Sequence, residues 1–406
     1  MILTIEKLGH LGEAMTQGEN GPIFVAQMLP GEVVEGDLVG NRLENARILT
    51  PSVNRVKPPC VHARSCGGCL MQHANDDFVA EWKTEVVRSA LAGQGLAAIL
   101  RPIRTSPANS RRRATIAGRR TKGGALLGFH ARGSDALVAV PNCQLLHPDL
   151  MAAFPALEAL VITGGSRKTE LALTITRSLA GPDVSVTGGK PLDGQLRLEL
   201  ARVAEAHGLS RLSWDAEVVA LRASPMQAMG RARVAPPPGA FLQATEAGEA
   251  DLLAAVMDAV GNAKRITDLF AGSGTFSLPL SEQAEVHAVE GDAAMMAALD
   301  KGWRMAEGLK RITTETRDLF RRPLEPDEFK NIQAVVIDPP RAGAEAQTKT
   351  LATARVPVIA AVSCNPVTFA RDARILIAAG YRLDWVQPID QFRWSSHVEL
   401  AARFSL

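Results

Sequence analysis

The feature of this sequence that most constrains its fold is an alternation of helix-like and strand-like segments after Ala235-Pro236-Pro237-Pro238-Gly239. Helical periods such as EAGEADLLAAVMDAV alternate with short apolar runs such as RITDLF, AVVI and VPVIAAV. Repeating strand–helix units imply a parallel sheet with helices on both faces. We therefore expect residues 236–406 to form one α/β domain, and the 406-residue chain has room for one or two more.

The sequence before this boundary predicts two further parts. Residues 1–55 contain short β-like runs separated by Gly and Pro, a pattern typical of a small barrel. Residues 56–235 begin with a cysteine-rich stretch, continue with an amphipathic helix near 76–95, and then read as a mostly antiparallel β insert. The predicted fold is thus multidomain α/β, with a central α+β domain between the barrel and the α/β domain.

Bulk properties narrow the setting of the protein. The sequence has no apolar run of about 18 residues and no signal-peptide core near its start, so we expect a cytoplasmic protein, monomeric and without a membrane span. The net charge is only +2, but no acidic residue occurs from Val86 to Ser134, where arginines are frequent. A basic segment of this kind indicates an anionic partner, although a solvated basic surface would give the same pattern.

A glycine-rich turn follows the first strand of the α/β domain. RITDLF runs into Ala271-Gly272-Ser273-Gly274-Thr275, a turn that lets the backbone approach a ligand closely. Three carboxylates stand at consecutive strand ends, and such groups suit ribose hydroxyls: they are Asp268, Glu290 and Asp318. The turn lacks the third glycine of a pyrophosphate site, which favours S-adenosylmethionine over NAD. A lone G-x-G is otherwise an ordinary tight turn.

Two further strand ends carry reactive side chains. One strand leads into Asp338-Pro339-Pro340-Arg341 and the next into Ser363-Cys364-Asn365-Pro366, so both loops are expected at the ligand edge of the sheet. The C-terminal segment adds His397 and Glu399 as bases. A thiol, a base and a further polar group are what methylation of uracil at C5 requires, because the thiol must first add to C6. A buried structural thiol and an exposed carboxylate are the alternatives.

Taken together, the motifs resemble those of the RNA 5-methyluridine (uracil-C5) methyltransferase family. FLQAT, DLFAGSGTFSLPL, IDPPRAG, VSCNP and HVE occur in the family's order, over nearly the whole chain. The resemblance implies a Rossmann-like class I methyltransferase domain, an N-terminal OB-like TRAM barrel over residues 1–55, and a helix near 76–95 that packs on the catalytic domain. Thr245, Thr275 and Arg393 depart from the residues usual in the family.

The resemblance also assigns site residues. It implies Cys364 as nucleophile and Glu399 as base, with Asp338 as the third catalytic group, and it places Phe241 beside the target base. Around S-adenosylmethionine it implies the following residues: Gln243, Phe270, Gly272, Gly274, Thr275, Glu290, Asp318 and Asp338.

Four cysteines remain outside the α/β domain: Cys60, Cys66, Cys69 and Cys143. Their spacing fits zinc or an iron–sulfur cluster equally well. The family resemblance implies a [4Fe–4S] cluster, which we expect to be structural.

The expected substrate is structured RNA, since a uracil must be unstacked before a thiol can reach C6. Candidate phosphate contacts are Arg111, Arg112, Arg113, Arg119 and Arg120. The TRAM-like start favours 23S rRNA, with tRNA as the alternative. Cytosine-C5 methylation is a rival reaction, but RNA enzymes of that type generally use two cysteines and the α/β domain has one. A non-catalytic RNA-binding assembly factor is the rival from another class.

Overall fold

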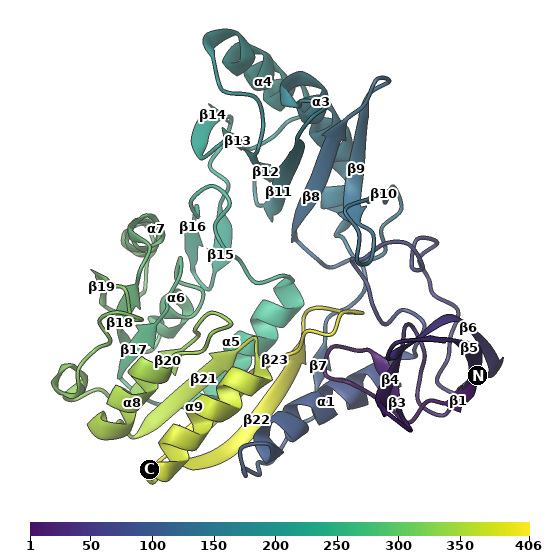
Figure 1. Cartoon of the computed structure of the whole chain (residues 1–406). Helices are drawn as coiled ribbons and strands as arrows, with labels where there is room; N and C mark the ends of the chain where they lie inside the picture. Colours follow the sequence, from purple (N-terminus) through teal and green to yellow (C-terminus); the bar gives the residue numbers. More distant parts are fainter.

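The computed structural model describes all residues, 1–406, as three large sheets and a two-stranded hairpin (Figure 1). An N-terminal sheet lies beside a large C-terminal sheet, and a central sheet projects away from both. No helix combines the length and apolar character that crossing a bilayer requires.

The N-terminal sheet closes on itself. Its order is β1-β5-β6-β4-β3-β2, and β1 and β2 belong to one stretch, residues 2–8. This stretch pairs with β5 at one edge and with β3 at the other, so the sheet forms a barrel around a small apolar core that includes Ile5, Val25 and Val34. The strands are β1 (Ile2–Thr4), β2 (Lys7–Leu8), β3 (Ala14–Gly18), β4 (Gly21–Val25), β5 (Val33–Val39) and β6 (Arg42–Thr50).

The central sheet has seven strands in the order β10-β9-β8-β11-β12-β13-β14. All neighbours are antiparallel except β12 and β13. This parallel pair differs from the expected antiparallel insert, because a helix crosses over between the two strands. The elements are β8 (Arg113–Arg120), β9 (Ala125–His130), β10 (Leu137–Ala139), α2 (Pro148–Ala152), α3 (Phe154–Gly164), β11 (Glu170–Ser178), β12 (Gly181–Thr187), α4 (Gly194–Ala206), β13 (Arg211–Trp214) and β14 (Glu217–Leu221).

The C-terminal sheet has eight strands in the order β19-β18-β17-β20-β21-β23-β22-β7, and its first five strands are parallel. Only β23 runs antiparallel to both of its neighbours. The strands are β17 (Arg265–Leu269), β18 (Glu285–Glu290), β19 (Ile312–Thr316), β20 (Ala334–Ile337), β21 (Val358–Ser363), β22 (Arg382–Asp390), β23 (Glu399–Ser405) and the short β7 (Arg104–Thr105). The helices are α5 (Glu246–Val260), α6 (Ser277–Leu280), α7 (Ala293–Arg304), the 3-10 turn η1 (Pro326–Phe329), α8 (Glu345–Ala354) and α9 (Pro366–Ala378).

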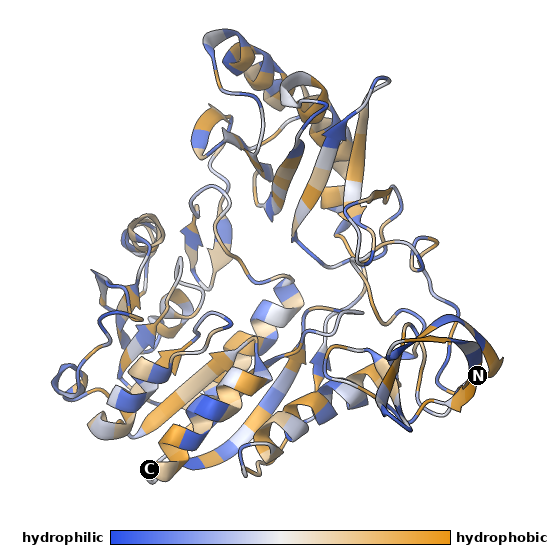
Figure 2. Ribbon diagram, in the orientation of Figure 1, coloured by the Kyte–Doolittle hydropathy of each residue, from blue (hydrophilic) through white to orange (hydrophobic).

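Two apolar cores cover the two faces of this sheet. Adjacent residues of β20 show the alternation, since Val336 belongs to one core and Val335 to the other. The strands are accordingly apolar along much of their length (Figure 2). The expected α/β domain with helices on both faces is therefore present.

Parts of the chain before residue 236 belong to this domain. Helix α1 (Asp76–Ala92) buries Val87 and Leu91 in the same core as α9 and β22, and β7 extends the sheet. The hairpin of β15 (Gln227–Met229) and β16 (Ala232–Val234) places Met229 and Val234 in the other core. The boundary expected at residue 235 is thus wrong, because the hairpin before the prolines packs with the C-terminal domain.

Candidate active site

The glycine turn after β17 requires an unusual backbone. Phe270 has φ 62° although it is not glycine, and Gly272 and Gly274 have φ 56° and 102°. A Cβ on Gly274 would lie 2.8 Å from a Leu278 side-chain atom, so only glycine fits there. The Glu290 carboxylate at the end of β18 accepts a hydrogen bond from the Gly272 amide at 3.0 Å. Glu290 therefore fixes the turn and stands beside any ligand that the turn holds.

Two acids lie at the centre of this edge. Asp268 is fully buried in β17 and accepts from the Ser277 hydroxyl at 2.6 Å, while its other oxygen has no partner. Burial raises the pKa of Asp268 to about 7, and the nearby charge of Asp338 contributes. Burial likewise raises the pKa of Asp338 to about 7. An adjacent cation would hold both groups ionised.

The expected nucleophile follows β21. Cys364 is partly exposed, and its loop is fixed because the Asn365 amide and the Thr368 hydroxyl both donate to the Arg341 carbonyl, at 3.0 and 3.2 Å. The DPPR and SCNP loops are thereby joined. Burial, followed by the charges of Glu399 and Asp338, raises the pKa of the Cys364 thiol to about 11.

The expected base, Glu399, faces this thiol. Strand register pairs Ser363 of β21 with Leu400 of β23, so Cys364 and Glu399 are the next residues opposite one another. Glu399 is 3% exposed, and burial together with the Asp338 charge raises its pKa to about 8. A carboxylate with a pKa in this range suits proton transfer near neutral pH.

A buried glutamine connects the base to the rest of the site. The Gln391 amide nitrogen donates to Glu399 and, at 2.5 Å, to the Gln243 side-chain oxygen. Its oxygen accepts from the Ala244 backbone amide at 2.7 Å. Every polar atom of Gln391 is therefore used, and its side chain orients Glu399.

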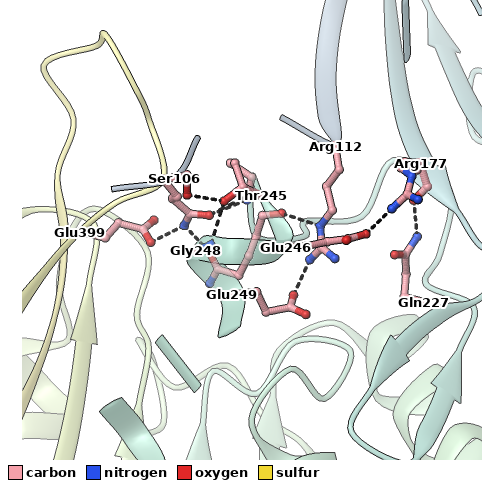
Figure 3. Close-up of polar contacts among 12 residues, drawn as sticks. Ser106, Arg112, Arg177, Gln227, Thr245, Glu246, Gly248, Glu249 and Glu399 are labelled. Atoms are coloured by element: carbon pink, nitrogen blue, oxygen red, sulfur yellow. Dashed lines mark hydrogen bonds and ion pairs between the residues drawn. The ribbon is translucent and has the colours of Figure 1, made fainter. Parts of the chain in front are cut away.

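Thr245 anchors the other end of this network. It caps α5 by accepting from the Gly248 amide at 2.9 Å, and its hydroxyl lies 2.7 Å from that of Ser106 (Figure 3). Thr245, which differs from the residue usual in the family at this position, thus caps helix α5. Sequence reasoning missed both Gln391 and Ser106; Gln391 lies directly after β22, but its contacts come from distant segments.

The remaining expected ligand contacts are arranged around this edge. Phe270 packs against Phe320 with ring centroids 5.4 Å apart, and Thr275 lies partly buried in the glycine turn. Asp318 is exposed and accepts from the Phe320 amide at 3.0 Å. Phe241 is 59% exposed, before the buried Gln243.

The basic segment turns largely inward. Arg112 is 4% exposed; it pairs with Glu249 of α5 and donates to the Gln243 carbonyl at 3.1 Å (Figure 3). The expectation that Arg112 contacts phosphate is therefore wrong. Arg113 donates to the Gly239 and Ala240 carbonyls, so it braces the linker.

The other arginines keep more contact with solvent. Arg111 lies with its guanidinium 5.6 Å from the Phe392 ring centroid. Arg119 pairs with Glu170 at 3.1 Å, and Arg120 is partly exposed. Among the five expected contacts, Arg119 and Arg120 have the most accessible setting.

The four other cysteines lie in one region. The pKa of Cys69 is raised to about 11, first by burial and then by the charges of Cys143, Cys66 and Cys60. The Arg132 guanidinium donates to the backbone carbonyls of this loop, among them Ala63 at 3.1 Å. No three of these side chains converge into a metal-ligand set. Their donor chemistry suits a soft metal, whereas their present arrangement does not complete a site.

Several known proteins are similar to this chain in sequence. A family model described as tRNA (Uracil-5-)-methyltransferase matches residues 232–404. An RNA methyltransferase of Mesorhizobium japonicum is 43% identical over 98% of this chain and 96% of its own length. A 23S rRNA (uracil(1939)-C(5))-methyltransferase of Marinomonas sp. is 31% identical over 97% of this chain and 92% of its own length.

The fold is also found in a solved structure. The crystal structure of Pyrococcus abyssi tRNA (uracil-54, C5)-methyltransferase in complex with S-adenosyl-L-homocysteine matches with a TM-score of 0.77, at 22% identity, over 100% of this chain and 99% of that chain. The sheet and its glycine turn, together with the family match, thus define an RNA methyltransferase. The chain belongs to the RNA uracil-C5 methyltransferase family, which confirms the resemblance seen in its motifs.

Proposed function

We propose that this protein methylates C5 of one uridine in a structured RNA through a covalent bond between Cys364 and C6. The observation that carries the proposal is the register that sets Cys364 opposite Glu399, with Asp338 close enough to raise the pKa of both side chains. A nucleophile and a base on neighbouring strands can act on adjacent carbons of one ring. The single cysteine of the C-terminal domain argues against the two-cysteine cytosine reaction.

The proposed steps conserve atoms and charge. Cys364 first releases its thiol proton to solvent. The thiolate then adds to C6, and the π electron pair of the C5=C6 double bond makes C5 nucleophilic. S-adenosylmethionine, when bound, would supply the methyl group that C5 takes, and the electron pair of the broken S–CH3 bond would stay on its sulfur. Glu399 then removes the C5 proton, the C5=C6 double bond re-forms, and the C6–S bond breaks to return the thiolate. Asp338 holds the polar edge of the uracil ring.

The methyl donor is proposed to lie at the glycine turn. Gly272, Gly274 and Thr275 would line its amino-acid part, and Glu290 and Asp318 its ribose. Phe270 and Gln243 would border the cleft, and Asp338 would lie between donor and target. Support comes from the position of the glycine turn, Glu290 and Asp338 at strand ends and from the partnerless Asp268 oxygen, which a cationic ligand would stabilise.

RNA containing 5-fluorouridine tests the mechanism, because fluorine cannot leave as a proton. The protein should form a denaturant-resistant adduct, and Cys364→Ser should form none. With ordinary RNA, Glu399→Gln should retain methylated RNA on the enzyme, since the final elimination is blocked. Glu285→Gln, an exposed position at the far end of β18, is the control and should turn over normally. Normal turnover by Cys364→Ser would refute the mechanism, and absence of any adduct would favour a non-catalytic RNA-binding factor.

We propose 23S rRNA as the substrate, with tRNA as the alternative. The Marinomonas relative named for 23S rRNA matches over nearly its full length at 31% identity. The N-terminal barrel, proposed to be a TRAM-type OB-like domain, and the accessible Arg119 and Arg120 would grip the RNA backbone. Mapping which 5-methyluridine disappears from rRNA or tRNA after gene deletion decides between the substrates.

We also propose that Cys60, Cys66, Cys69 and Cys143 take up a structural [4Fe–4S] cluster. Four thiols gathered in one region supply the ligand chemistry, and the iron ions would offset both the burial and the mutual repulsion that raise the pKa of Cys69. Protein purified without oxygen should contain iron and sulfide in equal amounts, and Cys69→Ser should reduce both. Zinc without sulfide would contradict the cluster.

A further inference from the structure

A second cavity adjoins the nucleophile on the side of the barrel. It has a volume of about 310 Å³, and its lining includes Cys364, Val367 at the start of α9, Trp82 and Glu85 of α1, and His10 and Leu11 of the turn between β2 and β3. This volume lies at the lower end of the roughly 300–1,000 Å³ range typical of small-ligand sites. Five segments far apart in sequence, which also include Arg341 and residues 396–398, therefore enclose one site that reaches the Cys364 sulfur.

The target uracil ring does not account for this cavity. The ring must contact Cys364 and face Glu399, Asp338 and the methyl donor. None of Glu399, Asp338 and Gln243 lines the cavity, which instead extends from Cys364 toward α1 and the barrel. A chain that places one uridine over Cys364 must continue past it, and the cavity is directly adjacent.

The walls combine apolar faces with a polar edge. Leu11 and Val367 are 57% and 58% exposed, an unusual setting for apolar side chains, and Trp82 adds a flat apolar surface. The Glu85 carboxylate lies in the wall, where one oxygen pairs with Arg88 and the other accepts from the Ser89 hydroxyl at 2.9 Å, and its remaining lone pairs can take another donor. A nucleobase has this same division, with apolar faces and hydrogen-bonding edges.

The cavity is preformed, because the barrel turn fits closely on α1. Gly12 has φ +82°, and a Cβ there would lie 2.5 Å from a Leu70 side-chain atom and 3.4 Å from Trp82. The Leu70 and Met71 amides are bound in turn to the Trp394 carbonyl, at 2.6 and 2.9 Å. The turn is thus held at a fixed distance from the catalytic domain.

We propose that this cavity binds the unstacked base of the nucleotide next to the target uridine, and that Glu85 selects a base with an amino group over uracil. Adenine, cytosine and guanine present such a donor, whereas uracil presents carbonyls at the equivalent positions. This inference rests on the proposed function and deepens it, since the cavity fixes the sequence context of the methylated uridine.

The test uses short RNA hairpins in which each neighbour of the target uridine is replaced in turn by an abasic nucleotide or by uridine. At one of the two positions the abasic change should raise the KM of the parent enzyme about tenfold, with kcat little changed. Uridine at that position should bind several-fold more weakly than cytidine. In Glu85→Gln this preference should vanish.

Leu11→Ser should raise the KM for the unaltered hairpin, and the abasic change should then cost nothing more, because both remove the same contact. Leu198→Ser on α4 is the matched control: it is also 57% exposed and does not line the cavity, so it should leave KM unchanged. Multiplicative effects of Leu11→Ser and the abasic change, or no effect at either neighbour, would overturn the proposal. Failure of the proposed function is distinct, because the parent would then form no 5-methyluridine in any hairpin.

Discussion

Glu399 shows how one residue acquires its chemistry from its surroundings. Burial and the Asp338 charge raise its pKa to about 8, although its strand position alone would suit any small side chain. The base must be ionised to take the C5 proton. We therefore expect kcat/KM to rise with pH and to level off above about pH 8. A pH–rate profile of the parent enzyme checks this limb, and a flat profile between pH 6 and 8 would contradict the role of Glu399.

The same raised pKa predicts a stability effect. The native state binds the Glu399 proton more tightly than the unfolded chain, whose value is 4.5. The protonated Glu399 therefore adds to the free energy of unfolding. This stabilisation is fully present below pH 4.5 and is lost as the pH rises toward about 8. Glu399→Gln keeps an acceptor for Gln391 and removes the buried charge. It should be more stable than the parent at pH 8, by roughly 2–4 kcal/mol, and nearly equal to it at pH 5. Urea denaturation at both pH values measures the difference.

At the scale of elements, the segment 391–398, which precedes Glu399, is held by contacts from three other segments. Lys83 of α1 donates to the Phe392 carbonyl at 3.1 Å, Leu70 and Met71 donate to Trp394, and Arg393 donates to the Ser106 carbonyl at 3.2 Å. Trp394 has φ 61°, which costs on the order of 1 kcal/mol for a non-glycine residue. The surrounding contacts, rather than local preference, therefore determine the path of this segment.

Lys83 offers a direct test of this support. It is fully buried with its ammonium 2.6 Å from Asp390, which also accepts from the Phe392 amide. Lys83→Met leaves the buried Asp390 carboxylate without its cationic partner. The substitution should lower the free energy of unfolding by about 3–5 kcal/mol. Lys83→Met/Asp390→Asn keeps an acceptor without a charge and should recover most of that loss. Its kcat should nevertheless fall while KM is retained, because Gln391 loses its support. Full activity of the double variant would show that the pair serves stability alone.

Sequence periodicity predicted the helices and strands well, but it did not predict the contacts between residues that lie far apart in the sequence. The strand–helix alternation and the motifs at strand ends placed Cys364, Asp338 and the glycine turn at one edge, because parallel strands carry their loops there. Gln391 and Lys83 gave no such indication, since their partners lie far away in the sequence. The hairpin of β15 and β16 was assigned to the wrong domain for a similar reason: Pro236–Pro238 mark a turn in the chain and not the edge of a core.

At the scale of the whole molecule, the arginine-rich segment joins the central sheet to the catalytic domain. Arg112 begins this connection: its guanidinium is buried against Glu249 and Gln243, and Arg177 of β11 pairs with Glu246 of the same helix (Figure 3). A charge run that suggests a surface for RNA thus includes residues that fix the domain orientation. Whether an arginine is free to contact RNA or is paired inside the protein depends on whether a carboxylate from another segment meets its guanidinium. Composition alone cannot reveal this.

Replacing Arg112 should therefore separate stability from RNA affinity. Arg112→Ala leaves Glu249 buried without its partner, and we expect a loss of about 3 kcal/mol together with faster proteolysis at residues 235–240, as the central sheet loosens from α5. Arg119→Ala is the matched control, because its half-exposed pair with Glu170 lies within the central sheet and should contribute under about 1 kcal/mol. Arg119→Ala should instead weaken RNA binding and reduce its salt dependence. Equal stability losses in the two variants, measured by urea denaturation, would show that Arg112 is not what ties the domains together.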